Sequence, residues 1–123
     1  MEQAVVDWRT RGYGLMAVTD RASGRFLGRC GLQSVTGHAE PELGWVLRAD
    51  AWGRGYGSEA ARACLAWALA DLRLTSVISL IHPRNHAAVR VAERVGMVHD
   101  GAAELRGVPV DVYRANSVTA ASQ

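Results

Sequence analysis

The sequence predicts a single α/β (α+β) domain in which a mixed, mostly antiparallel central sheet is covered by helices on both faces. Three observations predict this fold class. Between residues 13 and 48, apolar and polar residues alternate in three short runs separated by turns. After Gly57 the apolar residues recur every three to four positions, which is the helical period. A nearly continuous apolar run over 75–81, a second helical segment and a final hairpin complete the chain.

The length and composition fit one globular domain. The chain has 123 residues, of which 49% are hydrophobic and 21% are charged, enough to bury a modest core. We assign residues 1–116 to the domain and expect residues 117–123 to fray. The net charge of +2 is spread along the chain, which argues against nucleic acid and membrane surfaces as partners. The sequence has no membrane-length apolar run and no signal core, so we expect a cytoplasmic protein.

The first half of the chain is expected to form a short helix and three antiparallel strands. Residues 2–11 have an amphipathic pattern typical of a surface helix. The runs 13–20 and 25–35 form a hairpin around a turn that contains Gly24. The alternating run 42–48 follows a second turn and supplies the third strand.

The second half is expected to alternate between helices and strands. A helix extends from Gly57 to Leu72, and the run 75–81 is a central strand, parallel to the strand that ends at Arg48. A helix over 85–96 and a hairpin over 96–116 follow.

Neither the cysteines nor the histidines predict a metal site. Cys30 and Cys64 lie in apolar stretches without CxxC spacing, so we expect two buried free thiols and no disulfide. Pro83 interrupts helical geometry between His82 and His86. No metal is therefore expected.

Three glycines alternate in WGRGYG, residues 52–57, directly before the expected helix. A helix start leaves about four amide N–H groups unpaired and carries a partial positive charge, so it can bind phosphate where no side chain blocks the approach. A nucleoside-triphosphate loop would need a lysine, and the chain contains none. A dinucleotide fingerprint would need GxGxxG near the start of a βαβ unit, whereas the spacing here is GxGxG after antiparallel strands. A tight turn without a ligand is the other alternative.

Two stretches together resemble the GNAT acetyltransferase superfamily: ELGWVLRADAWGRGYGSEAARACLAWA (42–68) and HPRNHAAVRVAERVGM (82–97). The resemblance is strongest to the RimJ/RimL-like branch of ribosomal-protein N-terminal acetyltransferases. Residues 52–57 match the family's pyrophosphate loop, Gln/Arg-x-x-Gly-x-Gly/Ala, with Trp52 in the first position. The resemblance implies a GNAT fold with a splayed pair of parallel central strands. It also implies transfer of an acetyl group from acetyl-CoA to a primary amine.

The resemblance implies a coenzyme A site built largely from backbone. The backbone of Val46, Leu47 and Arg48 would pair with the pantetheine arm as an added strand. The pyrophosphate would be held by the backbone amides of Arg54, Gly55, Tyr56, Gly57 and Ser58, with added charge from the arginine. Asn85 matches the family asparagine that contacts the pantetheine or the acetyl end. Capping of the next helix explains Asn85 equally well, and the two roles are compatible.

The catalytic residues implied by the resemblance are Glu42 and Asn85. Glu42 matches the glutamate of the family's Glu-Ile-Gly pattern and is the expected general base, with an exposed strand carboxylate as the alternative. A backbone N–H near Leu47 would meet the oxyanion. The family's usual proton donors, Ser or Tyr, lie three and seven residues after the asparagine, where this chain has Ala88 and Ala92. Neither alanine can donate a proton.

The expected acceptor is a protein or peptide N-terminus, ahead of an amino sugar or a small metabolite. A catalytically degenerate acyl-CoA-binding or regulatory module is the non-enzymatic alternative, because the usual donors are absent. Members of this branch normally have an extra strand before the segment matched here, and the resemblance implies that this chain starts after it. The strand 13–20 would then be an open sheet edge, which predicts a homodimer.

Overall fold

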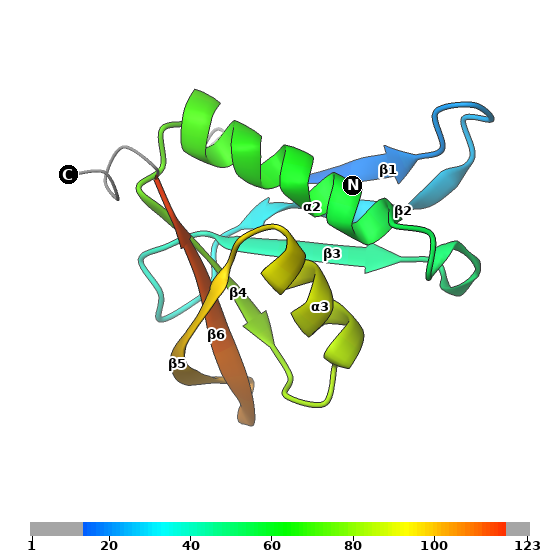
Figure 1. Cartoon of the computed structure of the whole chain (residues 1–123). Coiled ribbons are helices and arrows are strands. Elements are labelled where there is room, and N and C mark those ends of the chain that lie inside the picture. The colour runs from blue at the N-terminus through cyan, green and yellow to red at the C-terminus, as the bar shows by residue number, and fades with distance from the viewer. Residues whose placement is uncertain (1–13, 118–123) are drawn as a thin grey trace.

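The computed structural model describes residues 14–117, which form a six-stranded sheet with its α-helices on one face (Figure 1). The strands are β1 (Leu15–Thr19), β2 (Phe26–Gln33), β3 (Glu42–Leu47), β4 (Ser76–Ile81), β5 (Val98–Leu105) and β6 (Val108–Asn116). The helices are the 3-10 turn η1 (Ala49–Ala51), α2 (Tyr56–Ala66), its π-helical continuation η2 (Trp67–Asp71) and α3 (His86–Arg94). The helix expected over 2–11 and the chain end from residue 118 lie outside the described residues.

The sheet confirms the predicted mixed topology, but within residues 14–117 the α-helices cover one face of the sheet, not both faces as predicted. Its strand order is β1-β2-β3-β4-β6-β5, and every neighbouring pair is antiparallel except β3 and β4. These two parallel strands are paired at Glu42 and Ile78, and they diverge beyond that point (Figure 1). The last strand ends at Asn116, as expected, and just beyond it Ser117 N donates to Thr75 O at 3.0 Å.

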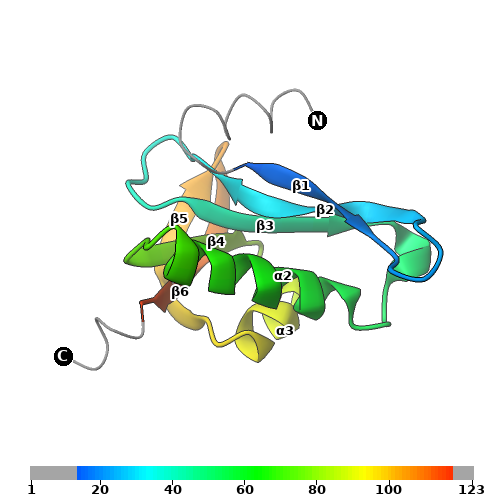
Figure 2. The ribbon, with the colours of Figure 1, turned by 90° about the horizontal axis from the view of Figure 1, so that it is seen from above.

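The core lies mainly between the sheet and its two α-helices, which share one face of the sheet (Figure 2). Helix α2 buries Ala61, Cys64 and Leu65, and Ala68 continues the same row in η2, as the three-to-four spacing predicted. The opposite face carries a smaller apolar cluster made of Ile78, Leu80, Val110 and Val112. Within residues 14–117, no helix combines the length and apolarity needed to cross a bilayer.

Both cysteines are buried and free, as predicted. Cys30 belongs to β2 and Cys64 to α2, and the two thiols share a hydrogen bond inside the core. That hydrogen bond and burial raise the pKa of Cys30 well above its usual range.

A glycine allows β2 and β3 to approach each other closely. A Cβ atom on Gly28 would lie 2.0 Å from the Val46 carbonyl oxygen, closer than any side chain can come. Close to this point β2 has an extra residue opposite β1, because Val18 pairs with Gly28 and Thr19 pairs with Phe26.

Candidate functional site

The candidate site begins where β3 and β4 separate. Beyond the Glu42–Ile78 pair, side chains instead of backbone groups bridge the two strands. Ser79 Oγ donates to Leu43 O at 2.7 Å, and Leu80 N donates to Glu42 Oε2 at 3.2 Å. The gap between the strands is therefore closed at one end by two side-chain bridges, and it widens toward the C-terminal ends of both strands.

One edge of the β3 backbone faces this gap. Leu43 O points toward β4, where it accepts from Ser79. Backbone groups of a strand alternate in direction with a period of two residues, and β3 pairs with β2 in unbroken register. The backbone groups of Trp45 and Leu47 therefore point the same way as those of Leu43. Trp45 was not among the predicted contacts, although the strand alternation could have identified it.

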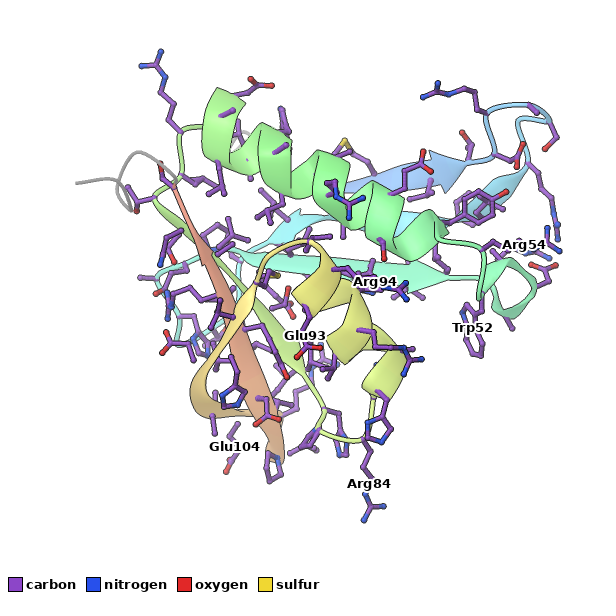
Figure 3. The ribbon with its side chains drawn as sticks, viewed as in Figure 1. Trp52, Arg54, Arg84, Glu93, Arg94 and Glu104 are labelled. Carbon is purple, nitrogen blue, oxygen red and sulfur yellow. The ribbon has the colours of Figure 1, made fainter. Side chains whose placement is uncertain are left out.

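The other residues predicted to pair with the pantetheine face β2. Arg48 N donates to Leu27 O at 2.7 Å, so this amide is already used within the sheet. Val46 lies two residues earlier and shares that direction. On the β4 side, Leu47 O accepts a hydrogen bond from Trp52 Nε1 at 3.1 Å. The Trp52 side chain is 68% exposed and extends outward near the end of β3 (Figure 3).

The glycine loop turns the chain into α2. Gly53 and Gly55 have φ values of 75° and 82°, in the left-handed region that favours glycine. Gly55 is the N-cap of α2, and no side chain caps the helix there. Gly57 lies inside the first turn, and a Cβ atom there would contact Val91 Cγ2 at 3.5 Å. Gly53 and Gly55 therefore allow the left-handed backbone of the turn, and Gly57 allows α2 to pack closely beside α3.

The start of α2 offers unpaired backbone donors. The first amide bonded inside the helix is Glu59 N, which donates to Gly55 O at 3.0 Å. The amides of Tyr56, Gly57 and Ser58 precede it and have no partner within the helix. Ser58 Oγ is also buried and has no hydrogen-bond partner among the described residues. A Cβ atom on Gly55 would meet nothing within 4 Å, so the approach to these amides is open.

A hydrogen bond anchors this helix start to the β1–β2 turn. Tyr56 Oη donates to Asp20 Oδ2 at 2.7 Å. This bond lowers the pKa of Asp20 and raises the pKa of Tyr56. The exposed Arg54 lies in the loop just before α2 (Figure 3), where it adds positive charge. The partners Asp20 and Tyr56 are 36 residues apart, so no local pattern predicted their contact.

Asn85 caps α3. Its Oδ1 accepts a hydrogen bond from Ala88 N at 3.2 Å, which confirms the capping role. Ala92 is fully buried in the core between α3 and the sheet, and Ala88 is half-buried against the same core. The two alanines that replace the family's donors therefore serve helix packing.

Glu42 is half-buried, so the alternative of an exposed strand carboxylate is wrong. Its Oε1 accepts from Gln33 Nε2 at 3.3 Å, and its Oε2 accepts from Leu80 N at 3.2 Å. Burial raises the pKa of Glu42, while the two hydrogen bonds and the nearby His38 partly oppose this rise. The result is a carboxylate with increased proton affinity, as a general base requires.

Two side chains of this site, Gln33 and Ser79, were not predicted from the sequence. Gln33 and Glu42 flank the turn between β2 and β3, so their hairpin spacing could have predicted a cross-strand pair. Ser79 carries no such signal, because a single serine in a buried strand does not reveal which partner it binds.

Comparisons with known proteins agree with this geometry. Residues 1–98 match the family model described as Acetyltransferase (GNAT) domain. The chain is 36% identical over 119 residues to the uncharacterized protein YkkB of Bacillus subtilis (strain 168), covering 91% of this chain and 69% of that protein. An acetyltransferase structure from Agrobacterium tumefaciens str. C58 is similar with a TM-score of 0.83 and 32% identity, covering 94% of this chain and 67% of that one.

A third similarity concerns the fold alone. The ribosomal-protein-S5-alanine acetyltransferase of Vibrio fischeri has a TM-score of 0.78 at 16% identity, covering 92% of this chain and 67% of that one. The splayed parallel pair, the glycine loop before α2 and the family match all agree, and we conclude that the chain belongs to the GNAT acetyltransferase family.

Proposed function

We propose that this protein transfers an acetyl group from acetyl-CoA to a primary amine. The observation that carries the proposal is the place of Glu42, a half-buried carboxylate with a raised pKa at the closed end of the gap between β3 and β4. The β4-facing edge of β3 and the start of α2 lie further along the same gap. GNAT acetyltransferases generally use acetyl-CoA, which supplies an activated thioester.

The residues present fit coenzyme A. Phosphate oxygens match the unpaired amides of Tyr56, Gly57 and Ser58, and the orphaned Ser58 Oγ would gain a partner there. Arg54 adds positive charge beside them. The amide groups of a pantetheine arm match the backbone of Leu47 and, by the alternation of β3, that of Trp45.

The proposal refines the predicted cofactor set. Val46 and Arg48 contribute by holding β3 against β2, and the Arg48 amide is already paired with Leu27. Asn85 uses Oδ1 to cap α3, and its side-chain NH2 group would donate to the pantetheine or the acetyl end.

In the proposed mechanism Glu42 accepts the proton of the amine, directly or through one water. A peptide α-amino group has a pKa of about 8, so a carboxylate of increased proton affinity is a suitable acceptor. The backbone N–H of Leu47 or Trp45 would donate to the charge that develops on the acetyl oxygen. A simple thiol has a pKa of about 8.5, so the thiolate can depart without a dedicated acid.

We propose a protein or peptide N-terminus as the first acceptor class to test, on the basis of the RimJ/RimL-like branch. Amino sugars and small amines form the second class. Ala88 and Ala92 favour one further candidate, a catalytically degenerate acyl-CoA-binding module, because they remove the usual donors. We also propose that the active form is a homodimer.

Thiol release tests the proposal. The protein is incubated with acetyl-CoA and a panel of short peptides, amino sugars and small amines, and free coenzyme A is measured against a sample without amine. We expect amine-dependent release with at least one class. In parallel, acetyl-CoA at 100 times Kd should stabilise the fold by about 2.7 kcal/mol. Stabilisation without release would support the binding module, and the absence of both effects would refute the proposed function.

A further inference from the structure

We propose that Gln33 is a positioning residue that orients the Glu42 carboxylate for proton transfer. The inference rests on the proposed function, because it assigns the partner of the proposed base. Gln33 is the last residue of β2, and its cross-strand partner in β3 is Glu42.

The carboxylate is held from two strands at once. Gln33 Nε2 donates to Oε1 at 3.3 Å from β2, and Leu80 N donates to Oε2 at 3.2 Å from β4. One donor on each oxygen restricts rotation of the carboxylate group. An ionised carboxylate has about four acceptor positions, so two bound donors leave positions free for the proton of the amine.

The arginine in the same row of the sheet is paired with other carboxylates. The row across the sheet runs from Glu42 through Ile78 to Arg114. Arg114 donates to Glu40 Oε2 and to Asp100 Oδ2, both at 2.6 Å, so it is neutralised by other carboxylates. The apolar Ile78 separates Arg114 from Glu42.

The other groups around Glu42 are two apolar side chains and one histidine. From β4 the side chains of Ile78 and Leu80 contribute apolar surface, and from the β2–β3 turn His38 contributes positive charge when protonated. Among the described residues, Gln33 is the side chain that the structure shows hydrogen-bonded to Glu42. Because a donor stabilises the ionised form, its removal should raise the pKa of Glu42 further.

Gln33→Met tests the inference, because methionine has a similar length and no amide donor. We expect the acidic limb of the pH profile of kcat to move to higher pH, with a loss of activity near neutral pH that recovers as the pH rises. KM for acetyl-CoA should be unchanged, since Gln33 lies outside the proposed cofactor contacts. The ¹³C resonance of the Glu42 carboxyl group should titrate at higher pH in the variant.

Two further variants sharpen the test. Gln33→Glu places a second carboxylate against Glu42 and should move the acidic limb further upward, since two like charges oppose ionisation. Asp100→Asn removes a charge from the same face without touching either Glu42 oxygen, and its profile should stay near that of the wild type. An equal shift in Asp100→Asn would attribute the effect to the whole face and overturn the role of Gln33.

The outcomes separate this inference from the proposed function. If the wild type releases thiol and Gln33→Met lowers activity equally at every pH, Gln33 has only a packing role and the proposed function stands. If the wild type shows no turnover with any amine, the proposed function fails. The ¹³C titration then still decides whether Gln33 controls the ionisation of Glu42, because it needs no substrate.

Discussion

The Glu42 side chain has two roles, one in the sheet and one in the proposed reaction. Its Oε2 accepts the hydrogen bond from Leu80 N, which a backbone carbonyl of β3 would accept if the two parallel strands stayed paired. Its burial, at the same time, raises its pKa and suits it to accept a proton. A variant that keeps the shape of the side chain but removes its charge can separate these roles.

Glu42→Gln should lower kcat by about 10²- to 10⁴-fold, the usual contribution of a general base. The amide oxygen of the new side chain can still accept from Leu80 N, so acetyl-CoA affinity should remain near that of the wild type. Stopped-flow or steady-state thiol release and calorimetric binding would measure the two quantities. Glu104→Gln is the matched control, because Glu104 is exposed on β5, two strands beyond β4 in the sheet (Figure 3). Wild-type rates in Glu42→Gln would remove this residue from the mechanism.

The same substitution makes a prediction about stability. The folded-state pKa of Glu42 is raised above its ordinary value of 4.5, so its contribution to stability is fully present below about 4.5 and is lost as pH rises through the folded pKa. Glu42→Gln should therefore melt at the same or a higher temperature than the wild type near pH 8, and the difference should shrink toward pH 4. Thermal melts at both pH values measure this. A variant that melts far lower at pH 8 would show that the ionised form is needed for folding.

The glycine loop (residues 52–57) and the start of α2 form the proposed phosphate site, which depends on their backbone conformation. Gly55→Val should abolish the stabilisation by acetyl-CoA, because a branched side chain would stand in the open space before the amides of α2. Gly107→Val is the matched control, since Gly107 has a φ of 81° against 82° for Gly55 and lies in the β5–β6 turn. Both variants share the backbone strain of a left-handed residue. Melting curves with and without acetyl-CoA should show a ligand shift in Gly107→Val alone.

The end of β3 carries a contact that competes with the proposed cofactor pairing. Trp52 Nε1 donates to Leu47 O, a carbonyl on the β4 side of the strand. Trp52→Phe frees that carbonyl while keeping an aromatic ring. Because a hydrogen bond contributes about 1 kcal/mol net, we expect acetyl-CoA to bind about fivefold more tightly. Isothermal titration calorimetry would measure the change. Weaker binding in Trp52→Phe would show that the indole belongs to the binding surface.

Strand β1 lies at one end of the sheet that residues 14–117 form. Met16 on this strand is exposed. A cavity of about 560 Å³ lies between β1 and α2, lined by residues that include Met16, Val18, Cys64 and Trp67. An end strand next to an apolar recess is a surface that proteins commonly cover by strand pairing or assembly.

We predict that the protein forms a homodimer across the edge of β1. Sedimentation equilibrium over a concentration series should give a dimer at tens of micromolar, and the outward amides of residues 15–19 should be protected from hydrogen exchange in the dimer. Met16→Lys should weaken the dimer, because charges on edge strands oppose pairing. A monomer at these concentrations with rapidly exchanging β1 amides would rule out this assembly.

The order of strands and helices along the chain and the glycine loop before α2 follow from local patterns in the amino-acid sequence. These features depend on local periodicity and on one contiguous motif, and both are set by neighbouring residues along the chain. The buried cysteines and the Asn85 cap followed from equally local patterns.

The assembly of the site depends on contacts between distant parts of the chain. The register of β3 on β4 brings Leu80 N to Glu42 and Ser79 Oγ to Leu43 O across 38 and 36 residues of chain. The Tyr56–Asp20 bond likewise joins two turns across 36 residues. Such contacts depend on how strands from distant parts of the chain align, and a shift of one residue would turn each side chain to the opposite face. The partners of Glu42, and with them its pKa, are therefore properties of the folded sheet and not of the Glu-Leu-Gly motif.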